Sequence, residues 1–257
     1  MSRTPVRIPL ELVAALAMAV GLPAAGRAQA DAAANGDRLM TTGATEAAIE
    51  AYRAGLAAHP DDATLLWKTA RALSNLADET TGDSGDEVRM EEAVELSRRA
   101  VRAAPGMSRA HTTLAASLGK LALFRGGKRK VELAREVGRE ARRAAELDPQ
   151  DFAPFTVLGV LERELATLNP LLRGFAGALF GGVPDASLER SAALLGRAVR
   201  LGPGYVAPHL ELARTYAEMD RDAESRAELE KALALPQQER LDGLLQNQAR
   251  ELLRELE

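Results

Sequence analysis

Five prolines, each placed at the end of a helix-like segment, divide this 257-residue chain into similar units. Each proline follows a stretch in which a small residue and then Ala or Leu occur, as in Ala144–Pro149 and Ala198–Pro203. Because proline cannot continue a helix, each of these segments is expected to end one. The prolines are Pro60, Pro105, Pro149, Pro203 and Pro236.

A second pattern begins six residues after each of the first four prolines. It is a large residue, a small one four positions later and, in three of the four cases, a large one after three more. This spacing places all members on one helical face, and the small residue lets a neighbouring helix approach closely. The sets are Leu66, Ala70 and Leu73; His111, Ala115 and Leu118; Phe155 and Gly159; and His209, Ala213 and Tyr216.

The two patterns together resemble the tetratricopeptide repeat, a pair of helices that recurs along the chain. One pair cannot bury its apolar faces alone, so the pairs must stack on one another. The low aromatic content of 4% also favours helices over a β-sandwich or barrel. The sequence therefore predicts an all-α, tetratricopeptide-like helical-repeat solenoid.

The repeats are irregular in length. The prolines are 45, 44, 54 and 33 residues apart, and only the last spacing is close to the usual period of about 34. We place the additional residues at 80–86, 126–128 and 169–184. The predicted domain covers residues 37–257, with about four and a half helix pairs and a capping helix over 241–256.

The N-terminal residues have the pattern of a secretory signal peptide. Arg3 and Arg7 precede an apolar stretch, and Ala28-Gln29-Ala30 supplies the small residues that a signal peptidase requires. We expect residues 1–30 to be removed by cleavage after Ala30, residues 31–36 to form a flexible leader, and the protein to be exported to the periplasm. An uncleaved anchor and an amphipathic helix are the alternatives.

Several segments in the second half of the chain resemble the regulator of microtubule dynamics family, a tetratricopeptide-like group. The similarity covers roughly residues 63–255, and its most specific part is Leu179-Phe180-Gly181-Gly182 followed by 184–189. The chain departs from the family pattern at Val183, where a proline is expected, and at Val160, Leu161 and Arg163, where aromatic residues are expected. The segments are 124–131, 144–149, 158–159, 178–184, 186–192 and 198–203.

The resemblance implies a helical-repeat interaction domain whose eukaryotic relatives are linked to microtubules or membranes. It implies no catalytic residue. Since the signal peptide predicts export, we do not carry the microtubule role over to this chain.

The sequence offers no chemistry for catalysis or cofactor binding. It contains no cysteine, and its three histidines, His59, His111 and His209, are far apart in sequence. Phosphate-loop, esterase and zinc-protease motifs are absent. The net charge of −4 does not favour nucleic-acid binding. We therefore expect no enzyme, no cofactor, no metal and no nucleic-acid partner.

Two segments are candidate binding surfaces. Residues 120–143 contain nine Lys or Arg residues and three acidic residues. This basic segment suits an acidic partner or anionic lipid, unless acids of neighbouring helices neutralise it. Residues 165–184 are mostly apolar and contain one charged residue, Arg173, and they either contact a partner or pack against the repeats. The candidate residues are Lys128, Arg135, Arg139, Arg142 and Arg143, with Leu171, Leu172, Phe175 and Phe180.

These features predict a non-enzymatic interaction scaffold that binds a peptide or protein partner in its concave face. The alternative is a lipid-binding or membrane-associated repeat module that uses the basic segment and the apolar insertion.

Overall fold

The computed structural model describes residues 24–80, 85–168 and 185–256, and these residues are helical apart from short connections. No helix within these ranges is long and apolar enough to cross a membrane. The helices are α1 (Ala24–Thr41), α2 (Thr45–Ala58), α3 (Ala63–Glu79), α4 (Asp86–Ala103), α5 (Ser108–Leu121), the 3-10 helix η1 (Ala122–Phe124), α6 (Gly127–Leu147), α7 (Phe152–Ala166), α9 (Leu188–Leu201), α10 (Val206–Ala217), α11 (Asp222–Ala234) and α12 (Arg240–Glu255).

Within the described ranges, the helices form five pairs and a final helix. The pairs are α1 with α2, α3 with α4, α5 with α6, α7 with α9, and α10 with α11. Each pair packs on the next, and each helix-ending proline lies two residues beyond the second helix of a pair. The expected tetratricopeptide-like solenoid is confirmed, and α12 occupies the segment expected for the capping helix.

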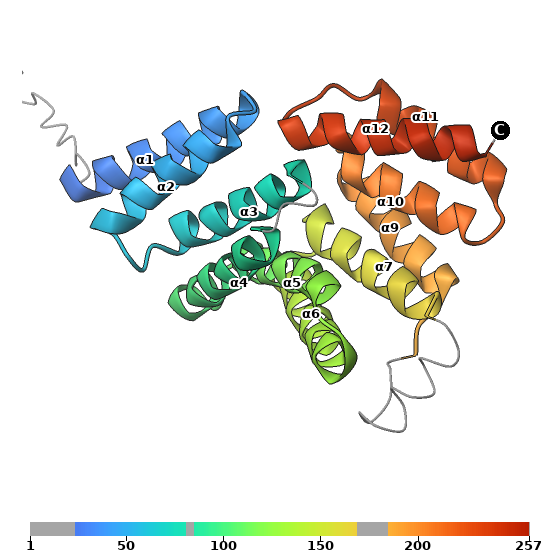
Figure 1. Cartoon of the computed structure of the whole chain (residues 1–257), viewed down its shortest axis with the longest axis horizontal. Helices are drawn as coiled ribbons and strands as arrows, with labels where there is room; N and C mark the ends of the chain where they lie inside the picture. The colour runs from blue at the N-terminus through green and yellow to red at the C-terminus, as the bar shows by residue number, and fades with distance from the viewer. Residues whose placement is uncertain (1–23, 81–84, 169–184, 257) are drawn as a thin grey trace, which may run out of the picture.

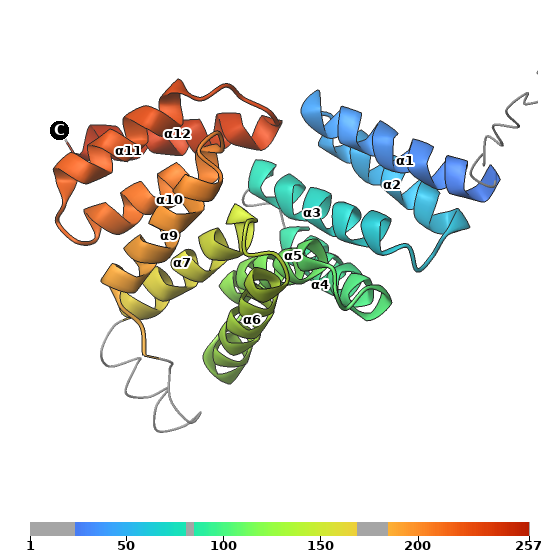
Figure 2. The same ribbon diagram turned by 180° about the vertical axis from the view of Figure 1, so that it is seen from behind.

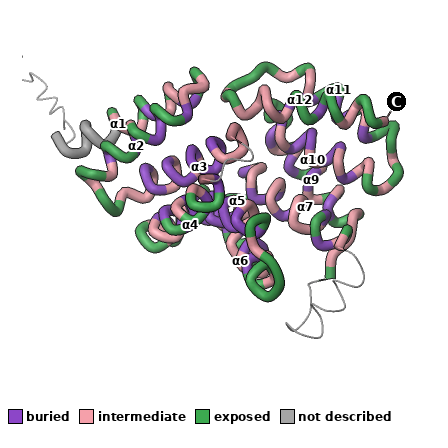
Figure 3. Tube along the Cα trace, viewed as in Figure 1, coloured by how far each residue is buried: buried purple, intermediate pink, exposed green. Residues whose placement is uncertain are grey.

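The large–small–large pattern forms the contact inside the pairs. Leu66, Ala70, Leu118 and Ala213 have no exposed surface. The small residue is a geometric requirement in α7, because a Cβ atom on Gly159 would lie 2.4 Å from Leu195 Cγ of α9. Figure 3 shows the buried residues concentrated on α3 and α5, in the middle of the molecule.

The expected flexible leader at residues 31–36 is wrong, because these residues lie within α1. Their alanines favour a helix, and Gly36 allows α1 to lie directly against α2. A Cβ atom on Gly36 would be 2.1 Å from the Tyr52 ring, whose hydroxyl donates a 2.8 Å hydrogen bond to Asp37. Burial, together with this hydrogen bond, raises the pKa of Tyr52. The repeat domain thus includes a full first pair, and the cleavage site expected after Ala30 falls inside α1.

Of the three expected insertions, only the second is fully described. It lies at the start of α6, where Gly126 precedes the helix and Gly127 has a φ of +51°, a conformation that glycine adopts without strain. Residues 81–84 and the insertion 169–184 lie outside the described residues.

The first helices of the pairs from α3 onward follow one another around the centre of the molecule (Figure 1). α3 contacts α5, α5 contacts α7, α7 contacts α10, and α10 contacts α12. The N-terminal end of α12 then returns to α3, as the view from behind also shows (Figure 2). We call α3, α5, α7, α10 and α12 the inner helices. They form a closed ring, which was not expected from a linear array of repeats.

Candidate functional site

The basic segment forms the exposed side of α6. Lys128, Arg139, Arg142 and Arg143 are exposed and Arg135 is half-buried, so these five residues lie together along one helix. Lys128 Nζ lies 3.7 Å from Glu132, and Arg143 Nη1 lies 3.2 Å from Glu146.

Acids of neighbouring helices neutralise the beginning of the segment. Lys120 pairs with Asp78 of α3 at 2.5 Å, and Arg125 pairs with Glu87 and Glu91 of α4. Among the described residues, Lys130, Arg139 and Arg142 make no ion pair. The positively charged surface is therefore smaller than the nine Lys and Arg residues of this segment suggested.

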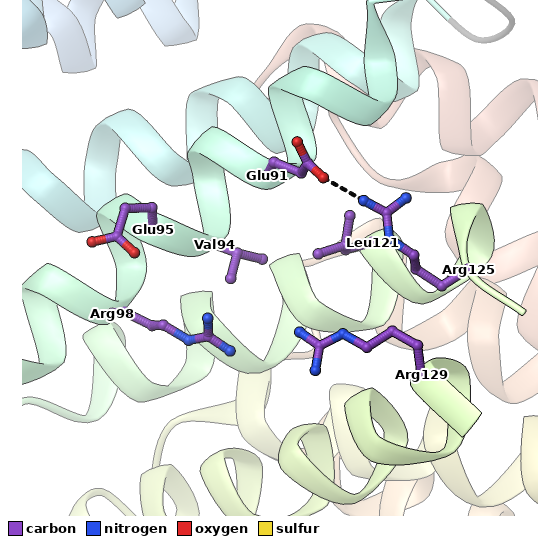
Figure 4. A pocket seen from close by; sticks show the side chains of 7 residues that line it. All are labelled: Glu91, Val94, Glu95, Arg98, Leu121, Arg125 and Arg129. Atoms are coloured by element: carbon purple, nitrogen blue, oxygen red, sulfur yellow. Dashed lines mark hydrogen bonds and ion pairs between the residues drawn. The ribbon is translucent and has the colours of Figure 1, made fainter. Parts of the chain in front are cut away.

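An open cavity of about 350 Å³ lies between α4 and α6 (Figure 4). Arg98 and Arg129 point towards one another, and Val94 and Leu121 lie beside them. Its lining residues are Glu91, Val94, Glu95, Arg98, Leu121, Arg125 and Arg129.

The arginines of this cavity already have carboxylate partners. Arg98 Nη2 donates to Glu136 at 2.9 Å, and Arg129 Nη1 donates to Glu132 at 3.3 Å. Because Arg125 also has acidic partners, the cavity is close to charge balance and does not indicate an anion site.

The apolar candidates Leu171, Leu172, Phe175 and Phe180 lie outside the described residues. Among the four large apolar side chains that the described residues expose, two are neighbours in sequence and were not candidate binding residues. Leu123 is 73% exposed and Phe124 is 43% exposed, both in η1 and directly before the basic turn at 125–130. No sequence pattern distinguishes them, because they continue the apolar end of α5.

Polar side chains bridge each joint of the ring of inner helices. Ser74 and Ser117 are 3.2 Å apart between α3 and α5, and Arg109 Nε lies 3.1 Å from Asp151 between α5 and α7. Arg163 donates to Glu211 at 2.7 Å between α7 and α10. These contacts fix the inner helices side by side.

The last two joints involve α12. Arg214 of α10 donates to Gln248 at 2.8 Å. Glu239, the N-cap of α12, lies 3.1 Å from Arg71 and accepts from Asn75 at 3.2 Å, which completes the ring at α3.

The inner helices leave one stripe of α7 uncovered. Val157 and Leu161 pack against the core of the preceding pairs, and Gly159 meets α9. The helical period then places Ala153, Thr156, Val160 and Glu164 together on the remaining side. None of these four is buried.

The corresponding stripe of α5 contains Arg109, Thr112, Ala116 and Lys120, of which only Thr112 is buried. We call these eight residues the inner face. Its middle is made of small side chains, Thr112, Ala116, Thr156 and Val160, with charged residues towards the helix ends.

His111 and His209 have structural roles, as their equivalent repeat positions predicted. His111 Nδ1 lies 2.7 Å from Glu140, and Nε2 lies 3.0 Å from the Pro105 carbonyl. His209 has the same arrangement with Glu228 at 2.6 Å and the Pro203 carbonyl at 3.2 Å. Burial opposes ionisation of Glu228, yet hydrogen bonds from His209 and Lys231 hold the pKa of Glu228 below its usual range.

The paired helices, the stacked pairs and the uncovered inner face define a tetratricopeptide-like helical-repeat protein. Solved structures show the same fold. A thermophilic TPR protein from Thermus thermophilus superposes with a TM-score of 0.65 at 19% identity, covering 88% of this chain and 99% of that one. PilF of Pseudomonas aeruginosa gives 0.54 at 15% identity, covering 91% and 89%.

Within this class the chain belongs to the regulator of microtubule dynamics family. The model described as "Regulator of microtubule dynamics protein 1-3" matches residues 29–257. Regulator of microtubule dynamics protein 1 of Bos taurus is 28% identical over 197 residues, which are 76% of this chain and 62% of the relative. Protein 3 of Mus musculus is 26% identical, over 73% of this chain and 40% of the relative. The chain thus spans less than two thirds of these relatives.

Nothing in the described part of the chain is arranged for metal chemistry, since no three His, Cys, Asp or Glu side chains there could hold an ion together. The relatives are named as regulators, and the neighbour from Thermus thermophilus is named as a TPR protein.

Proposed function

We propose that the protein is a non-enzymatic interaction scaffold that binds a peptide or protein segment along its inner face. The observation that carries this proposal is the row of small side chains on two adjacent inner helices, Ala116 on α5 and Thr156 and Val160 on α7. They leave room for a bound chain, whereas Arg109, Lys120 and Glu164 supply charged groups at its sides. The family's name as a regulator supports an interaction role.

Filling the inner face is expected to prevent partner binding. Replacing Ala116 or Thr156 with tryptophan places a large ring where the segment would lie, without removing a core contact. We expect the affinity for the partner to fall at least about tenfold, with the melting temperature nearly unchanged. The partner would be captured from the native envelope fraction with the full chain, identified by mass spectrometry and titrated as a purified protein.

Ala103→Trp is the matched control, because Ala103 is exposed at the end of α4 and outside the inner face. Equal affinity of the Ala116→Trp and Ala103→Trp variants for the partner would exclude the inner face as the binding surface.

The second candidate function is binding to anionic membrane surfaces, and one observation favours it. Lys130, Arg139 and Arg142 have no acidic partner in the described ranges, and the exposed Leu123 and Phe124 precede the same helix. Basic side chains are attracted to anionic headgroups, and apolar ones enter the interface.

Vesicle flotation separates this candidate from the scaffold. If lipid is bound through α6, the Arg139→Glu and Arg142→Glu double variant should lose most of its binding to phosphatidylserine vesicles at about 0.1 M salt. The single variant Arg102→Glu, whose arginine already pairs with Glu95 at 3.0 Å, should bind as the unmodified protein does. Binding that does not change in the double variant would dismiss α6 as the lipid site.

We also propose that the protein is exported to the periplasm and cleaved after Ala30, on the strength of the basic start, the apolar stretch and the Ala28-Gln29-Ala30 motif. Cleavage there leaves residues 31–41 of α1, including Gly36 and Asp37 that contact Tyr52. Mass spectrometry of the native protein should find Asp31 first, and an N-terminus at Met1 or Ser2 would refute cleavage.

A further inference from the structure

A second open cavity, of about 320 Å³, lies where α12 returns to the start of the solenoid. Its walls come from the turn before α2, the first turn of α2, the end of α3 and the first residue of α12. The lining residues are Gly43, Ala44, Thr45, Glu46, Ala47, Leu76, Glu79, Thr80 and Arg240.

The Glu79 carboxylate in this cavity has one unused oxygen. The Glu79 side chain is only 2% exposed, and its Oε1 accepts a 2.8 Å hydrogen bond from Thr45 Oγ1. Oε2 is buried and accepts no hydrogen bond from any described residue. A buried charged oxygen that lacks a hydrogen-bond donor costs free energy. Glu79 Oε2 is therefore available to accept a hydrogen bond from a ligand.

The cation nearest to Glu79 does not supply that donor. Arg240 Nε lies 3.6 Å from Glu79 Oε2, beyond hydrogen-bond distance, and the Arg240 side chain is 59% exposed. Glu46, exposed on α2, is a second carboxylate lining the cavity. Two carboxylates against one guanidinium leave an excess of negative charge, which favours a cationic ligand.

The rest of the wall combines the hydroxyls of Thr45 and Thr80 with apolar side chains, and the apolar part narrows the class of cation. Leu76, Ala44 and Ala47 offer surface for methylene groups, which a bare metal ion would not use. The described residues also provide no set of three ligands for a metal.

We propose that this cavity binds an alkylammonium group. The ammonium donates to Glu79 Oε2, and its methylene chain lies against Leu76 and the alanines beside it, Ala44 and Ala47. A free amine and the lysine side chain of a partner both present this chemistry. The site is separate from the inner face, so it can fail or succeed independently of the proposed scaffold function.

Titration of the full chain with n-butylammonium chloride at constant ionic strength tests the site. We expect saturable binding with a dissociation constant on the order of millimolar, followed by NMR shifts of the Leu76 and Ala44 methyl groups. Glu79→Gln, which keeps the shape and the Thr45 contact, should weaken binding about ten- to a hundredfold. Glu50→Gln removes an exposed carboxylate one turn along α2 and should leave binding unchanged.

A second variant, at the rim of the cavity, keeps the proposal testable if Glu79→Gln does not fold. Ala47 is exposed, so Ala47→Trp should block the cavity and abolish binding while α2 stays intact. The proposal is overturned if butylammonium shows no saturable binding, or if both Glu79→Gln and Ala47→Trp bind it as the unmodified protein does.

A lysine-containing peptide and its norleucine counterpart identify the source of the ligand. Tighter binding of the lysine peptide than of butylammonium, lost in Glu79→Gln, assigns the site to a partner's side chain. Binding of butylammonium alone assigns it to a small amine.

Discussion

Replacing Arg163 with methionine is expected to lower the free energy of unfolding by about 3 kcal/mol. Arg163 is 7% exposed in α7, and its guanidinium donates to both the side chain and the backbone carbonyl of Glu211 in α10, at 2.7 Å and 3.1 Å. Methionine fills similar volume but removes the donor to Oε2 of the largely buried Glu211 carboxylate, whereas the carbonyl keeps its hydrogen bond from Thr215 Oγ1. Urea denaturation followed by circular dichroism measures the loss.

Arg214→Met is the matched control, because Arg214 donates to the same carboxylate at 2.6 Å but is 34% exposed. Its replacement should cost less than about 1 kcal/mol. If both substitutions destabilise equally, burial of the Arg163–Glu211 pair is not what makes Arg163 important.

Replacing Tyr52 with alanine should produce a loss of similar or larger size, about 3–5 kcal/mol, concentrated at the first helix pair. The Tyr52 side chain is fully buried against Gly36 and is hydrogen-bonded to Asp37, so it attaches α2 to α1 by both packing and a hydrogen bond. Without the ring, α1 keeps the buried Met40 and the partly buried Leu39 as its larger apolar contacts with the core.

Limited proteolysis combined with urea denaturation checks this prediction. The Tyr52→Ala variant should be cut within residues 31–41 at protease concentrations that leave the unmodified protein intact. Tyr52→Phe keeps the ring and loses one hydrogen bond, so it should cost only about 1 kcal/mol. Resistance of Tyr52→Ala to cleavage would mean that other contacts hold α1.

Local patterns were sufficient to predict the repeat architecture. Pro105 and Pro149 end helices because their ring is incompatible with a continued helix, and Ala70 and Gly159 mark close helix contacts because larger residues would not fit. The equivalent positions of His111 and His209 likewise predicted shared packing roles. Each of these inferences depends on residues within one or two turns of each other.

The parts that could not be predicted depend on distant residues. Arg163 departs from the aromatic pattern of the family, and its buried role depends on Glu211, 48 positions away. Residues 31–36 resembled a linker because nothing in them shows that Tyr52 would pack on Gly36. The cavity beside Glu79 includes Arg240 of α12, whose position follows from the accumulated angles between five helix pairs.

The contact of Glu239 with Asn75 joins residues 164 positions apart, whereas the other joints of the solenoid connect residues fewer than 50 apart. The entropy lost in closing a loop rises with its length, so this joint should form last during folding and open first. It is held by Arg71, Asn75 and Arg240, and not by a shared apolar core. The joint between α12 and α3 is therefore the point at which the ring can open, while the helix pairs on both sides of it stay folded.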